Sequence, residues 1–117
     1  MEFTIEFYET ASGKCPVKDF LEELRRSDLD DFTAVVAGLA KLRNRQYLRP
    51  PLSKALDEGL YELRHVGKLN TRVLYFFMRG GRIISVHGIR NKAMKIPTKD
   101  FKLAMERMRD WLARDPR

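Results

Sequence analysis

The sequence predicts an α+β fold with an antiparallel sheet, an N-terminal helical hairpin and a C-terminal helix, in the order β-α-α-β-β-β-α. Three strand-like apolar runs follow one another between residues 60 and 89. Two amphipathic helical stripes precede these runs and a third follows them. Because a short helical hairpin buries its apolar side against a larger element, we expect the two N-terminal helices to pack on the downstream sheet. The 117 residues suit a single domain, which we place at 1–117.

The first half of the sequence is typical of a strand followed by two helices. Residues 2–9 alternate polar and apolar side chains, which indicates a half-buried strand. Pro16 suits the first turn of a helix, and either Ser27 or Asp28 is expected to cap a second one. A Pro-Pro pair then stops helix formation, and residues 54–59 are expected to form a loop.

The second half is expected to form a three-stranded meander and a final helix. The expected strands are Leu60–Val66, Thr71–Met78 and Arg82–Ile89. Gly80 and Gly81 predict a tight hairpin, because glycine adopts positive φ without a steric penalty. Residues 73–78 are apolar without alternation, which predicts a central strand covered on both faces. Thr98 is expected to cap the final helix, whose methionine and aromatic stripe suits a core.

The charge of the chain is unevenly distributed. The net charge is +7, yet residues 60–117 hold 14 Lys and Arg against 5 Asp and Glu, whereas residues 1–59 hold 9 against 11. A basic half joined to a slightly acidic half indicates one surface that faces an anion. Nucleic acid is the first candidate partner, and a solvated charged surface is the alternative.

Several classes of protein do not fit this sequence. The single cysteine, Cys15, cannot form an intramolecular disulfide, and no run approaches the roughly 20 apolar residues of a membrane span. With no basic and apolar leader at the N-terminus, we expect a cytoplasmic protein without a membrane partner. His65, His87 and Cys15 are far apart in the sequence, and no phosphate-binding glycine motif occurs, so we expect neither a metal nor a cofactor.

The cations of the basic half carry the chemistry that the sequence suggests. Arg64 and Arg72 lie on neighbouring predicted strands and are expected to project into one cleft, and Lys92 and Lys95 follow the last strand. Arginine binds two phosphate oxygens at once, and lysine acts as a point charge. Cutting RNA through its 2′-hydroxyl also needs proton transfer, for which a lysine crowded by cations or His87 is a candidate. The alternative role of His87 is a packed, structural histidine.

Other charged residues of the basic half receive smaller roles. Further contacts to RNA are expected from Arg82, Arg90, Lys99 and Lys102. Glu62 is the one acidic residue on a predicted strand of this half. We expect it to be exposed or to pair with a neighbouring arginine, rather than to act as a general base.

Four segments of the sequence resemble the RelE/ParE superfamily of type II toxin–antitoxin toxins, with the phage-derived, HigB-like group as the nearest branch. These segments are Cys15–Leu21, Gly59–Arg64 (GLYELR), Thr71–Phe76 (TRVLYF) and His87–Ile89, the last leading to Lys92, Lys95 and Pro97. The similarity extends over most of the chain, from residue 3 to residue 112. The resemblance implies a RelE-like fold, in which Arg64 and Arg72 match two arginines of the family.

The resemblance also implies a function and leaves alternatives open. It implies a toxin that enters the ribosomal A site and cuts mRNA as an endoribonuclease, and that a helix-turn-helix antitoxin neutralises. The first alternative is a ParE-like inhibitor of DNA gyrase, which the absence of an obvious general base favours. The second is a non-catalytic module that binds nucleic acid. It is motivated by Asn91, which replaces a lysine of the family, and by Ile89, which replaces an aromatic residue.

Overall fold

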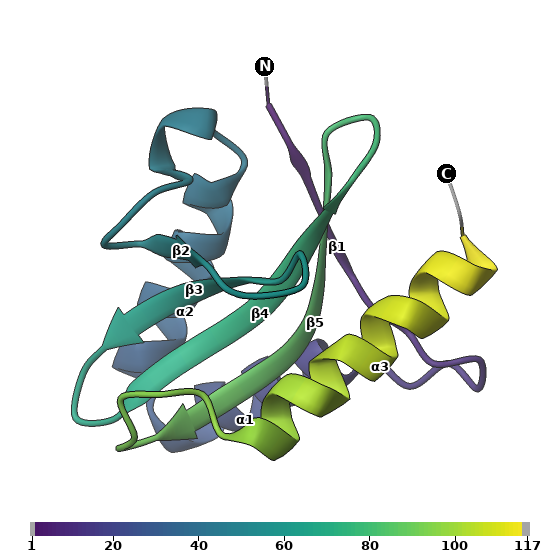
Figure 1. The fold of residues 1–117 in the computed structure, drawn as a ribbon. Helices are drawn as coiled ribbons and strands as arrows, with labels where there is room; N and C mark the ends of the chain where they lie inside the picture. The colour runs from purple at the N-terminus through teal and green to yellow at the C-terminus, as the bar shows by residue number, and fades with distance from the viewer. Residues whose placement is uncertain (1, 116–117) are drawn as a thin grey trace.

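The computed structural model describes residues 2–115 and consists of one five-stranded sheet with helices on both faces (Figure 1). The strands are β1 (Thr4–Phe7), β2 (Ser53–Ala55), β3 (Tyr61–Val66), β4 (Asn70–Met78) and β5 (Arg82–Asn91). The helices are α1 (Pro16–Ser27), α2 (Leu29–Leu42), the short 3-10 helix η1 (Arg45–Tyr47) and α3 (Thr98–Arg114). The predicted α+β class and the order of its main elements are confirmed. None of the helices in this part of the chain is both long and apolar enough to cross a membrane.

The sheet is mixed, although an antiparallel sheet was expected. Its order is β1-β5-β4-β3-β2, in which β1 runs parallel to β5 and the other neighbours are antiparallel. Strands joined by a tight hairpin must run antiparallel, whereas the long helical connection after β1 leaves its direction free. The expectation of a loop at residues 54–59 is partly wrong, because β2 pairs its residue Lys54 with Glu62 of β3. β2 has only three residues, which are too few to show the alternating pattern by which a strand is recognised in a sequence.

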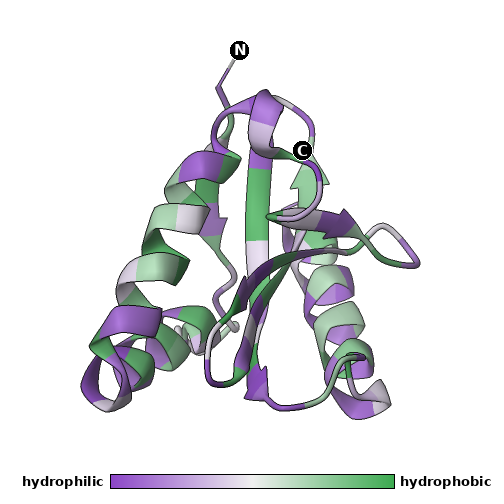
Figure 2. Cartoon of the chain, turned by 90° about the vertical axis from the view of Figure 1, so that its left-hand side faces the viewer, coloured by the Kyte–Doolittle hydropathy of each residue, from purple (hydrophilic) through white to green (hydrophobic). Residues whose placement is uncertain are grey.

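Each face of the sheet carries its own hydrophobic core. We call the side covered by α1 and α2 the hairpin face and the other side the α3 face; Figure 2 shows helices on both sides of the sheet. Val73 and Tyr75 of β4 belong to the core of the hairpin face, and Leu74 and Phe76 belong to the core of the α3 face. The prediction that β4 is central and covered on both faces is therefore confirmed.

The turns follow local chemistry closely. Gly80 and Gly81 have φ angles of 80° and 70°, which confirms the predicted glycine hairpin. Asp28, and not Ser27, caps α2, since its Oδ1 accepts the backbone N–H of Asp31 at 3.1 Å.

The expected cap of the last helix is wrong by one residue. Thr98 is the first residue of α3, and Pro97 occupies the capping position without a side-chain hydrogen bond. The carbonyl of Pro97 already accepts the N–H groups of Asp100 and Phe101, so the helical bonding begins before the threonine.

Candidate functional site

A cleft opens on the α3 face where β2, β3 and the segment before α3 meet. Its volume is about 470 Å³, and we call it the basic cleft. The charged and aromatic residues that line it are Lys54, Asp57, Glu62, Arg64, Lys95 and Phe101. Three cations, two carboxylates and an apolar wall therefore meet in one open hollow, a composition that suits a nucleic-acid strand with its phosphates and bases.

Arg64 and Arg72 lie side by side on this face. They are direct register partners on β3 and β4, and cross-strand partners point to the same side of a sheet. Nη2 of Arg64 donates to the carbonyl oxygen of Met94 at 2.9 Å, and Nη2 of Arg72 donates to Oδ1 of Asn91. Arg64 is thus tied to the segment that follows β5 and Arg72 to the last residue of β5, and the structure brings together the two arginines that the sequence singles out.

Arg72 is buried next to Arg64 and does not line the cleft itself. Its exposed fraction is 0%, and its Nε and Nη1 atoms have no hydrogen-bond partner within residues 2–115. Burial lowers the pKa of Arg72 and the charge of Arg64 adds to this effect, while the carboxylates of Glu62 and Asp100 oppose it. Because a guanidinium remains charged in proteins, the site contains a buried and incompletely bonded cation.

Glu62 is buried, although it was expected to be exposed or paired with an arginine. Its exposed fraction is 3%, so the exposed alternative is wrong. The pairing alternative is confirmed, because Oε1 of Glu62 lies 3.8 Å from Nε of Arg64. The other carboxylate oxygen, Oε2, is buried without a hydrogen-bond partner in the described part of the chain. The short strand β2, which the sequence does not reveal, runs beside Glu62 and brings Lys54 to the cleft.

The lysines differ in how close they come to the cleft. Lys95 lines it together with Arg64. Lys92 is exposed on the turn directly after β5 and does not line the hollow itself. Lys99 and Lys102 are exposed in the first turns of α3 and do not line the cleft.

A bulge in β5 positions His87. Leu74 of β4 pairs with His87 and the next residue of β4 pairs with Ser85, which leaves Val86 as an extra residue. Nε2 of His87 lies 2.7 Å from Oδ1 of Asp100, and Nδ1 lies 2.9 Å from Nη1 of Arg107. Both ring nitrogens are therefore bonded to α3, and His87 fastens this helix to the sheet.

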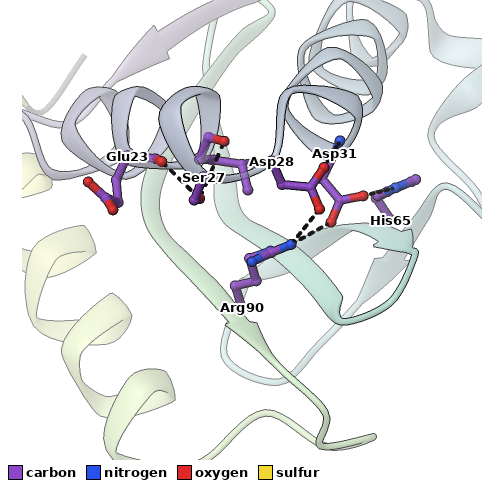
Figure 3. A network of polar contacts seen from close by, with 7 residues as sticks. Glu23, Ser27, Asp28, Asp31, His65 and Arg90 are labelled. Atoms are coloured by element: carbon purple, nitrogen blue, oxygen red, sulfur yellow. Dashed lines mark hydrogen bonds and ion pairs between the residues drawn. The ribbon is translucent and has the colours of Figure 1, made fainter.

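Two predicted RNA-binding arginines lie away from the cleft. Arg82 is at the opposite end of β5, where its Nε donates to Oε2 of Glu6 at 2.6 Å and its Nη2 donates to Asp115. Arg90 lies on the hairpin face, where its Nη2 donates to Asp28 and Asp31 at 2.8 and 3.0 Å (Figure 3). The structure does not bring these two arginines to the cleft, and local carboxylates balance their charges.

The comparisons with known proteins give one match. The sequence model of a family described as "Phage derived protein Gp49-like (DUF891)" matches residues 19–109, which is most of the chain. No curated protein matches the sequence. The matched segment contains β3, β4 and β5 and all the residues that line the basic cleft. In residues 2–115, no three His, Cys, Asp or Glu side chains gather as a metal site would require.

Proposed function

Because this chain belongs to the phage-derived Gp49-like family, which lies within the RelE/HigB-like clan of toxins, we propose that it is the toxin of a type II toxin–antitoxin system. Its activity is that of an endoribonuclease which cuts mRNA in the ribosomal A site, in the cytoplasm, and so stops translation. The observation that carries this proposal is the juxtaposition of Arg64 and Arg72 at a cleft lined by lysines.

The side chains of the cleft receive separate roles. Arg64 grips the non-bridging oxygens of the scissile phosphate, and Lys95, which lines the same cleft, adds a second positive charge. Arg72 places a buried cation next to Arg64, where a low dielectric strengthens its attraction for the charge that develops on phosphorus oxygens. Exposed Lys92 contacts the flanking backbone, and the chemistry requires no metal or cofactor.

An antitoxin completes the system. Toxins of this clan are paired with an antitoxin, and we propose a small helix-turn-helix protein encoded beside this chain. Acidic side chains of such a partner would neutralise the cluster of cations at the cleft and block entry of RNA.

The proposal is tested by inducing the chain in bacteria and by adding it to a translation extract. Growth arrest and cut mRNA are expected from the natural sequence. Arg64→Ala should lose both effects, whereas Arg79→Ala is the matched control, because Arg79 is an exposed arginine at the distant glycine hairpin. Intact message with normal growth would refute the proposal. Intact message together with inhibited supercoiling by gyrase would indicate the ParE-like alternative instead.

A further inference from the structure

Four buried polar atoms without hydrogen-bond partners belong to one cluster. They are Oε2 of Glu62, Nε of Arg64, and Nε and Nη1 of Arg72, each without a hydrogen-bond partner within residues 2–115, although Nε of Arg64 forms a 3.8 Å ion pair with Oε1 of Glu62. Nearly all buried polar atoms in folded proteins are bonded, and each exception costs free energy. Since Glu62 and Arg64 also line the basic cleft, the cluster has the character of a binding site that a ligand completes.

The chemistry of the four atoms defines the ligand. Three of them are N–H donors on cations and need anionic oxygens, whereas Oε2 of Glu62 is a carboxylate oxygen and needs a hydroxyl donor. An inorganic anion would satisfy the arginines and leave the carboxylate unbonded beside a second negative charge. A ribonucleotide in the cleft offers both groups to Arg64 and Glu62, which line it, because its phosphate lies next to a 2′-hydroxyl, which DNA lacks. The charge of Arg72, buried next to Arg64, adds to the attraction for the phosphate.

We propose that Glu62 is the general base of the site and the residue that selects RNA over DNA. This inference rests on the proposed function. Glu62 and Arg64 line the basic cleft and also a second hollow of about 560 Å³, so an RNA strand that occupied both hollows would pass these two residues. The bond from Arg64 to the carbonyl of Met94 is the contact that the incoming phosphate replaces.

Two groups that line the cleft can carry out the two proton transfers of RNA cleavage. Glu62 accepts the proton of the 2′-hydroxyl, and the 2′-oxygen forms a bond to phosphorus while the bond from phosphorus to the 5′-oxygen breaks. The ammonium of Lys95 gives a proton to that 5′-oxygen. The products are a 2′,3′-cyclic phosphate and a 5′-hydroxyl. Exchange of protons with water then restores the ionised forms of Glu62 and Lys95.

Other groups fit the role of base less well. Asp57 lines the same cleft, but it is exposed and does not belong to the cluster of unbonded atoms. Both ring nitrogens of His87 are held by residues of α3. Glu62 combines burial, an unbonded oxygen and contact with the cleft.

The test measures single-turnover cleavage of an mRNA held on the ribosome. Glu62→Gln keeps the size and shape of the side chain and removes the base, so cleavage should slow by at least about 100-fold. Glu106→Gln is the matched control and should remain within about threefold of the natural chain, because Glu106 is exposed on α3 and does not line the cleft.

A binding measurement separates this role from a structural one. The natural chain should bind an mRNA with a single 2′-deoxy nucleotide at the cleavage position about tenfold more weakly than the all-ribose mRNA, because a hydrogen bond to a charged group is lost. Glu62→Ala should bind both equally. Should the variants fail to fold, equal affinity of the natural chain for both mRNAs still overturns the inference.

The outcomes distinguish this inference from the proposed function. Suppose that the natural chain cuts mRNA and that the cleavage rate of folded Glu62→Gln is within about threefold of the natural rate. Glu62 is then not the base, and the proposed function stands. If the natural chain leaves mRNA intact on the ribosome, the proposed function itself fails.

Discussion

Nη1 of Arg107 lies 2.9 Å from Nδ1 of His87, and this contact fixes the protonation state of the imidazole. A guanidinium can only donate hydrogen bonds, so Nδ1 must accept, and the ring proton must be on Nε2. That proton is donated to Asp100 at 2.7 Å. The histidine therefore joins β5 to two positions of α3 only while its ring is neutral.

We expect acid to weaken the attachment of α3. Burial lowers the pKa of His87, with the charge of Arg107 acting in the same direction and Asp100 opposing. The proton that makes the imidazole cationic therefore binds more readily to the unfolded chain than to the folded one. Above the unfolded pKa of about 6.5, the stability that His87 contributes is complete. This stability falls as the pH drops toward the lower pKa of the folded state. Thermal unfolding followed at pH 7.5 and pH 5 should show a lower Tm in acid.

A variant isolates this contribution of His87. His87→Gln removes the titrating ring, so its Tm should depend less on pH over the same interval. His65→Gln is the control, because the ring of His65 contacts Asp31 on the other face and its removal leaves the α3 contacts in place. A Tm of the natural chain that is equal at the two pH values would contradict the protonation state inferred here.

Arg72 is expected to be important for activity and unimportant for stability. Its guanidinium is fully buried with two unbonded nitrogens, so the folded protein bears the cost of desolvating it. Arg72→Met keeps a long side chain and removes this cost. We expect mRNA cleavage to fall by at least about 100-fold. The free energy of unfolding in urea should stay within about 1 kcal/mol of the natural value or rise. A strongly destabilised variant would show that Arg72 has a structural role.

Arg90 is expected to show the reverse pattern. Burial acts to raise the pKa of Asp31, and hydrogen bonds from Arg90 and His65 outweigh it, so the pKa is lowered. Arg90→Met would remove the positive charge that pairs with the buried carboxylate of Asp31. We therefore expect the free energy of unfolding to fall by about 2–3 kcal/mol. Cleavage of mRNA by the folded variant should persist, because Arg90 lies on the hairpin face.

A surface ion pair provides the comparison for Arg90. Arg43 contacts Glu2 at 3.4 Å with both side chains about half exposed or more, and Arg43→Met should cost less than about 1 kcal/mol. Equal unfolding free energies for the two variants would mean that the Asp31 network contributes no more than an exposed pair. Loss of cleavage in a folded Arg90→Met would support the RNA contact that the sequence suggested for this arginine.

The sequence predicted the parts of the fold that repeat a pattern over many residues. The alternation in residues 2–9 and the apolar run in residues 73–78 identify strands, because burial on one or both faces imposes that pattern. The parallel direction of β1 was not predictable, since the same alternation serves either direction. β2 was missed because its three residues owe their pairing to β3 and not to their own sequence.

The part of the candidate site that lies on the β3–β4 hairpin was predictable from the sequence. Arg64 and Arg72 lie in strands joined by a short turn, so their approach follows from local pairing. The burial of Glu62 was not predictable, because the cover comes from β2 and from the segment before α3. The same holds for His87, whose partners Asp100 and Arg107 are on a helix that begins 11 residues later.

Gly88 of β5 is expected to tolerate no side chain, because Phe20 of α1 packs directly on it. A Cβ at Gly88 would lie 2.3 Å from two ring carbons of Phe20, well inside van der Waals contact. Gly88→Ala should therefore lower the free energy of unfolding by about 1–3 kcal/mol, measured in urea. The double variant Gly88→Ala with Phe20→Leu should recover part of this loss, since the smaller side chain leaves room for the methyl group. Strictly additive losses would mean that the ring is not the obstacle.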